Sequence, residues 1–134
     1  MVTLQEIISS YNRIETFIHR TPVLTNQSLN QLTGTQLYFK CENFQKAGAF
    51  KIRGATNVVQ QLHSTDMEKS IATASSGNHG AALAMAVSRR GGNVTVVMPD
   101  DSSPIKVDNV HRNGGDIIWC KPRQESREKV LNDF

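Results

Sequence analysis

A run of β-branched and apolar residues, Asn93 to Met98, constrains the fold more than any other part of the sequence. The run lacks polar alternation, which is typical of a strand buried on both faces of a parallel sheet. Gly91 and Gly92 end an alanine-rich helical pattern before it, and Ser103 and Pro104 begin another helix after it. Strands that alternate with helices in this way predict an α/β fold, an open parallel sheet with flanking helices and right-handed crossovers.

Periodicity extends this prediction to the rest of the chain. Apolar residues at three- and four-residue spacing predict helices, and short β-branched or aromatic runs between turn residues predict strands. The predicted helices cover residues 3–17, 28–32, 54–62, 79–90 and 125–131, with a further helix from 104 to the turn at 113–115, and the predicted strands cover 36–42, 69–74, 93–98 and 116–120. Glu42 and Asn43 are expected to be ordinary polar residues at a strand end.

Composition and charge exclude several classes of protein. With 38% hydrophobic and 20% charged residues, the 134-residue chain lies near the globular range and can bury a single core. Its net charge of +3 comes from scattered cations with few aromatic residues among them, which argues against a nucleic-acid partner. No apolar run reaches about 18 residues and the start lacks a signal-peptide pattern, so we expect a cytoplasmic protein without a membrane partner.

Neither the cysteines nor the histidines are spaced as metal ligands. Cys41 and Cys120 lie far apart in the sequence, and we expect two reduced, buried thiols. The four histidines are scattered, so no metal site is predicted in this chain.

Two cations stand where a helix is expected to begin, in the segment Ala49-Phe50-Lys51-Ile52-Arg53-Gly54. The helix macrodipole is positive at that end and disfavours the charged form of Lys51, which leaves its amine more available as a nucleophile toward a carbonyl. Gly48 and Gly54 would let a planar ligand approach the backbone. The alternatives are a surface lysine beside a turn and a core position for Phe50.

A second glycine-rich segment, Ser75-Ser76-Gly77-Asn78-His79-Gly80, joins a predicted strand to a predicted helix. Free backbone amides and the positive helix end converge there, which predicts a site for a phosphate or a carboxylate; the alternative is a plain helix cap made of serines. His79 is a candidate for proton transfer or for a hydrogen-bonded structural role. This segment and Lys51 are both expected at the carboxyl ends of strands, facing one crevice.

With Thr21-Pro22-Val23-Leu24 and Lys40-Cys41-Glu42-Asn43-Phe44-Gln45, the two motifs resemble, in order and spacing, those of pyridoxal-phosphate enzymes of the tryptophan-synthase-β superfamily, fold type II. The resemblance covers nearly the whole chain. It is closest to serine racemase and the serine/threonine dehydratases, because cysteine synthases have an aspartate where Ile52 follows the lysine. The implied fold is that of the small domain of these enzymes.

The resemblance implies a role for each matching residue. Lys51 would form the Schiff base with pyridoxal 5'-phosphate and move the substrate's α-proton on one face, with Ser76 as the acid or base on the other. Phe50 would pack against the pyridine ring, and Asn78 would hydrogen-bond the cofactor's 3-hydroxyl. The residues expected around the carboxylate of a β-hydroxy amino acid substrate are Ser75, Ser76, Asn78 and His79. Dehydration and racemisation share the first step, so both stay open.

We expect residues 1–134 to be the N-terminal part of a longer enzyme, mostly its small substrate-side domain (about 35–134), with the N-terminal helices belonging to a large domain. In the family, a glycine-rich phosphate loop and a divalent cation site lie in later sequence, and the resemblance implies a homodimer. Two alternatives remain open: a non-catalytic α/β anion-binding fragment, and a cysteine-synthase-like β-replacement enzyme.

Overall fold

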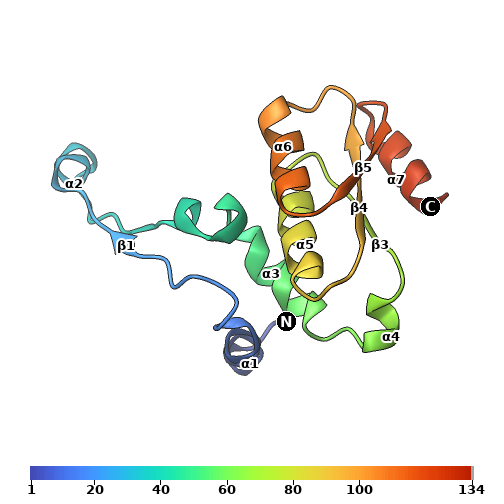
Figure 1. Ribbon diagram of the computed structural model, residues 1–134. Helices are drawn as coiled ribbons and strands as arrows, with labels where there is room; N and C mark the ends of the chain where they lie inside the picture. Colours follow the sequence, from blue (N-terminus) through green and yellow to red (C-terminus); the bar gives the residue numbers. More distant parts are fainter. Residues whose placement is uncertain (134) are drawn as a thin grey trace.

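The computed structural model describes residues 1–133, which form an α/β body and an N-terminal arm that projects from it (Figure 1). A three-stranded parallel sheet is the centre of the body, in the order β3 (Ile71–Ala74), β4 (Val94–Pro99) and β5 (Asp116–Cys120). Every residue of β4 is buried, because strands pair with both of its edges and helices cover its faces. The predicted open parallel sheet with flanking helices is confirmed.

Helices cover both faces of this sheet. Figure 1 shows α5 (Asn78–Ser88) and α6 (Pro104–Arg112) on one side and α7 (Gln124–Asn132) on the other. Helix α5 is the most buried, since Ala81, Ala82 and Ala84 are fully inaccessible to solvent. These small side chains allow α3 (Lys51–Val59) to pack closely against it.

The helix predicted over residues 54–62 begins and ends three residues earlier, as α3. The guanidinium of Arg90, just after α5, donates hydrogen bonds to the carbonyl of Val59, the last residue of α3, and to that of Leu62, the latter at 3.0 Å. These bonds supply side-chain donors to carbonyls at and just beyond the helix end. A short helix, α4 (Ser64–Met67), follows and was not predicted.

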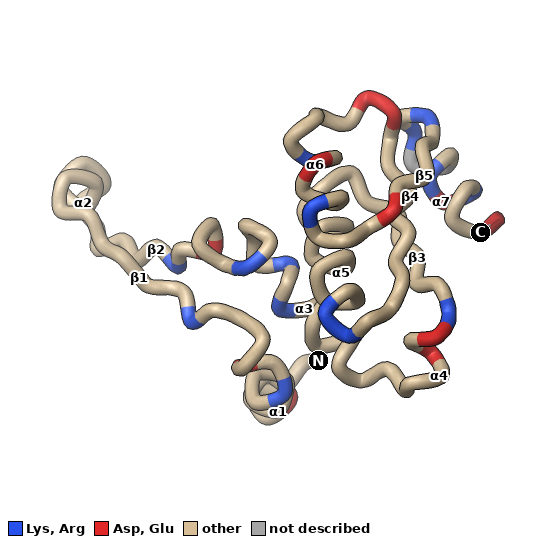
Figure 2. Tube along the Cα trace, viewed as in Figure 1, with Lys and Arg blue, Asp and Glu red and all other residues tan. Residues whose placement is uncertain are grey.

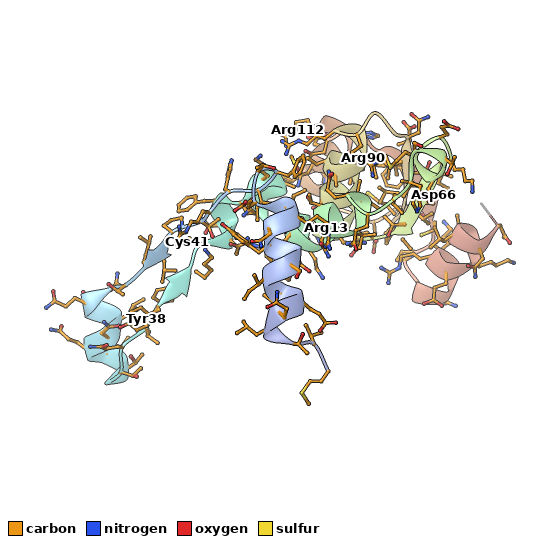
Figure 3. All side chains as sticks on the ribbon, turned by 90° about the horizontal axis from the view of Figure 1, so that it is seen from below. Arg13, Tyr38, Cys41, Asp66, Arg90 and Arg112 are labelled. Atoms are coloured by element: carbon orange, nitrogen blue, oxygen red, sulfur yellow. The ribbon has the colours of Figure 1, made fainter. Side chains whose placement is uncertain are left out.

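The arm contains short elements, of which the first helix and the last 3-10 helix also pack against helices of the body. They are α1 (Leu4–Ile14), β1 (Val23–Leu24), α2 (Gln27–Thr33), β2 (Phe39–Lys40), and the 3-10 helices η1 (Glu42–Phe44) and η2 (Lys46–Gly48). The strand predicted over residues 36–42 is wrong except at 39–40, because only β1 lies beside it and the pair is exposed. Figure 3 shows Tyr38 and Cys41 on the arm, apart from Arg90 and Arg112 in the body.

Helix α1 is shorter than the predicted 3–17 and begins with a capping box, in which Thr3 and Glu6 each accept a hydrogen bond from the other's backbone amide. Of its predicted apolar face only Ile14 is buried, while Leu4 and Ile7 are exposed. Lys and Arg residues are spread over both the arm and the body (Figure 2). Among residues 1–133, no helix has the length and apolar character needed to cross a membrane.

Candidate active site

Lys51 is the first residue of α3, so the structure places a cation at the start of a helix, as predicted. The chain enters the helix from a tight turn, because Ala47 and Gly48 have positive φ angles of 58° and 74°. The first turn is closed by the amide of Arg53, which donates to the carbonyl of Phe50 at 3.0 Å. This turn fixes where the Lys51 side chain leaves the backbone.

The Lys51 amine lies 5.2 Å from the centroid of the Phe50 ring, a distance at which a cation is attracted to an aromatic face. Phe50 is 58% exposed, so the alternative that placed it in the core is wrong. An exposed ring beside an exposed amine is consistent with the expected contact to a planar ligand.

A cavity of about 790 Å³ lies between α3, the outer edge of β3 and the start of α5. Lys51, Phe50 and His79 line it, so the lysine motif and the serine-glycine segment meet at one cavity. Ser75, Ser76 and Asn78 are not among its lining residues. Apolar side chains form much of the wall: Ala55, Val58, Leu62, Ile71 and Leu83.

Ser75 organises the loop between β3 and α5. Its side chain is buried, and its Oγ accepts hydrogen bonds from the amides of Gly77 at 3.2 Å and Gly80 at 3.0 Å. Ser75 therefore acts as the helix cap that the alternative interpretation described. A side chain at position 80 would not fit, because a Cβ there would lie 2.7 Å from Cγ1 of Val96 on β4.

The residues next to this cap carry amides without a hydrogen-bond acceptor in the described part of the chain. Ser76, Asn78 and His79 are exposed, and none of the hydrogen bonds found within residues 1–133 uses their backbone N–H groups. They lie at the positive end of α5, which is suited to an anion. The stem of Lys106, from α6, packs over Gly77, where a Cβ would lie 3.2 Å from its Cδ. The geometry thus offers an amide cluster for a carboxylate beside the Lys51 cavity.

Glu42 and Arg53 form an ion pair that the sequence interpretation missed. The Arg53 Nε donates to Oε2 of Glu42 at 2.8 Å, and a terminal guanidinium nitrogen, Nη2, donates to Oε1 at 2.6 Å. These bonds, with one from the Thr21 hydroxyl, lower the pKa of Glu42 to about 2. Glu42 is therefore not an ordinary strand-end residue. Local sequence spacing could not reveal the ion pair, since the partner of Glu42 comes from another element.

The described residues contain no cluster of three His, Cys, Asp or Glu side chains able to hold a metal ion. Both cysteines are free thiols, but only Cys120 is buried, and Cys41 is half-buried, so the expectation of two buried thiols is wrong for Cys41. Burial raises the pKa of the Cys120 thiol.

An α/β domain with a lysine at a helix start, an apolar cavity and an adjacent amide cluster has the layout of an enzyme domain for a small anionic ligand. Residues 14–133 match the family described as "Pyridoxal-phosphate dependent enzyme", and the chain belongs to that family. The resemblance seen in the sequence is therefore confirmed.

The relatives include racemases and dehydratases. The chain is 48% identical to β-hydroxyaspartate dehydratase of Paracoccus denitrificans over 96% of its own length and 41% of that protein. It is 46% identical to serine racemase of Dictyostelium discoideum, over 95% of its length and 39% of that protein. The structure of maize serine racemase superposes with a TM-score of 0.94 and 44% identity, covering 98% of this chain and 40% of the other. The chain spans about two fifths of the length of these relatives.

Proposed function

We propose that this chain is the N-terminal part of a pyridoxal-phosphate-dependent enzyme that dehydrates or racemises a β-hydroxy amino acid, with Lys51 as its cofactor-binding lysine. One observation carries the proposal: Lys51 lines a single cavity together with His79, which lies in the first turn of α5. Family membership and the racemase and dehydratase relatives support the same reaction class.

The residues present fit the cofactor. The Lys51 side chain is exposed at a cavity of about 790 Å³, and a primary amine is the group that condenses with the aldehyde of pyridoxal phosphate. Phe50 would lie against the flat ring, and Asn78, exposed at the start of α5, would hydrogen-bond the 3-hydroxyl. When bound, pyridoxal phosphate supplies an electron sink that stabilises negative charge at the substrate's Cα.

The start of α5 would hold the substrate. The amides of Ser76, Asn78 and His79 would bind the carboxylate, because they are unpaired within residues 1–133 and lie at the positive helix end. Ser75 would not contact the carboxylate with its buried Oγ, but would keep these amides in place through Gly77 and Gly80. Preorganised amides of this kind cost no reorganisation when the anion arrives.

Proton transfer at Cα would use side chains on two sides. The Lys51 amine would remove the α-proton from one face. The exposed hydroxyl of Ser76 would return a proton from the opposite face in racemisation. Departure of the β-hydroxyl would give dehydration. Both reactions share the first proton removal, so Lys51 is required for either.

We also propose that residues from about 35 to 134 belong to the substrate-side domain of the longer enzyme. In support, α2 lies away from the sheet at the end of the arm (Figure 1). The phosphate-binding loop, a divalent cation site and the surface for homodimer formation would then belong to the remainder of that enzyme. A cytoplasmic location is part of the same proposal.

The test measures the products that the full-length protein, with pyridoxal phosphate bound, forms from L-serine and from L-threo-3-hydroxyaspartate. Keto acid formation and the appearance of the D-enantiomer are followed separately. Lys51→Ala should abolish both products and the visible absorbance of the bound cofactor. Lys121→Ala, which removes an exposed lysine paired with Asp100, should leave all three unchanged. Full activity of Lys51→Ala would refute the assignment.

A second candidate function is anion binding without catalysis. The Ser75 cap and the amides next to it are complete within this chain, which favours it for the chain on its own. Titration of the chain with L-serine and with pyridoxal phosphate separates the two: anion binding without reaction at any lysine supports the second candidate.

A further inference from the structure

The segment that carries Lys51 is closed at its two ends by one ion pair. Glu42 begins η1, and Arg53 lies in the first turn of α3, so the chain from 42 to 53 forms a loop with Lys51 near its end. The two side chains meet through the paired hydrogen bonds of 2.8 and 2.6 Å. Both are largely withdrawn from solvent, with 27% and 18% of the Arg53 and Glu42 side chains exposed.

Gln45 fixes the middle of this loop to the arm. It is 4% exposed, and its Oε1 accepts from the amide of His19 at 2.8 Å and from that of Lys46 at 2.9 Å. Its Nε2 donates to the carbonyl of His19 at 2.7 Å. Arg53 also reaches this carbonyl, at 3.4 Å. Gln45 and Arg53 thus hold the same backbone residue from two points of the loop.

Thr21 braces the ion pair from the same stretch of the arm. Its hydroxyl donates to the Glu42 carboxylate, and its carbonyl accepts from the Lys40 amine at 2.7 Å. The first bond connects the start of the loop to the residue before β1 and Pro22, and the second connects the end of β2 to that same residue.

The loop has little regular structure of its own to hold its shape. It contains two short 3-10 helices and the first turn of α3, and Ala47 has a φ of 58°, a conformation that costs a non-glycine residue about 1 kcal/mol. Side-chain contacts therefore help to hold its geometry. Arg53 lines the Lys51 cavity, whereas Glu42 and Gln45 do not, so these two residues act on Lys51 through the loop and through Arg53.

We infer that Glu42, Gln45 and Arg53, here called the loop clamp, are positioning residues that hold the amine of Lys51 at the cavity for reaction with its carbonyl ligand. The inference rests on the proposed role of Lys51. It assigns these residues to the orientation of the amine, in addition to any contribution to folding. Small displacements of a reacting group cost large factors in rate, which makes such a clamp valuable.

The experiment measures the rate at which pyridoxal phosphate is fixed to Lys51 by borohydride in the full-length apo-protein, with peptide mapping. Lys69 lines the same cavity but lies outside the loop, so its labelling rate in the same sample is the internal reference. Glu42→Gln should slow Lys51 labelling about tenfold relative to Lys69.

Thr21→Val is the milder variant, used in case Glu42→Gln does not fold. It removes one hydrogen bond to Glu42 and should slow labelling about two- to threefold. If a folded variant has a lower melting temperature but an unchanged Lys51 to Lys69 ratio, the clamp is only structural and the inference is overturned. If the wild-type protein itself is not labelled at Lys51, the proposed function fails first, and the two failures are distinct.

Discussion

Gly80 at the start of α5 lies against Val96 of β4 so closely that a methyl group on its Cα would be 2.7 Å from Cγ1 of Val96. The contact holds the helix that carries the amide cluster directly on the central strand. Real Cβ atoms do not approach carbon this closely, so any side chain at position 80 would push α5 away from the sheet.

Gly80→Ala should therefore destabilise the protein by about 1–3 kcal/mol, the usual cost of overpacking a core, despite alanine's better helix propensity. Urea unfolding measures the change. Gly54→Ala is the matched control: Gly54 lies in α3, a methyl group on its Cα would meet no neighbouring atom within 4 Å, and the substitution should gain about 0.5–1 kcal/mol. Equal effects of the two substitutions would contradict the close packing of α5 on β4.

Ser75→Ala should cost about 1–2 kcal/mol, because it leaves the buried amides of Gly77 and Gly80 without an acceptor. Ser103 is the N-cap residue of α6, but its side chain makes no capping hydrogen bond. Ser103→Ala should thus change the free energy of unfolding by less than about 0.5 kcal/mol. Two equal losses in thermal unfolding would argue that Ser75 has no special role in the loop.

The strands and helices of the body could be predicted because their signals are local. Neighbouring residues alone indicate the apolar strand β4 and the start of α6 at Ser103 and Pro104, and both predictions are confirmed. In the arm, helices α1 and α2 lie within or close to the predicted ranges, but the contacts between its segments could not be predicted in this way. The pairing of Val23 with Lys40 and that of Glu42 with Arg53 join separate segments, and nothing in either segment alone indicates its partner.

The site was predicted in part. A cation at a helix start is a local anomaly, and Lys51 lies where that anomaly indicated. The serine-glycine segment was expected as a unit, but the structure separates its members: Ser75 points inward as a cap, while Ser76 and Asn78 are exposed. Repeated serines look alike in sequence, and only the path of the chain between β3 and α5 decides which of them is buried.

Glu42 makes stability depend on pH in the acid range. Hydrogen bonds from Arg53 hold its pKa at about 2, well below the ordinary value of 4.5. A carboxyl group whose pKa is lowered by folding stabilises the protein above its unfolded pKa, and this contribution is lost as the pH falls from about 4.5 to about 2.

Glu42→Gln should cost about 2 kcal/mol at neutral pH, and the difference from wild type should shrink across that acid interval. Unfolding free energies measured at several pH values test this. Asp100→Asn removes an exposed ion pair with Lys121 and should cost less than about 0.5 kcal/mol at neutral pH. If the difference in unfolding free energy between the wild type and Glu42→Gln does not vary with pH, the proposed contribution of the ion pair is contradicted.

The amine of Lys51 is the group that we propose binds the cofactor. The most direct measurement is borohydride reduction of the full-length protein with bound pyridoxal phosphate, followed by mass spectrometry of its peptides. With one equivalent of bound cofactor, we expect the pyridoxyl group on the peptide that contains Lys51. A pyridoxyl group on Lys69 or another lysine, with Lys51 unmodified, would contradict it.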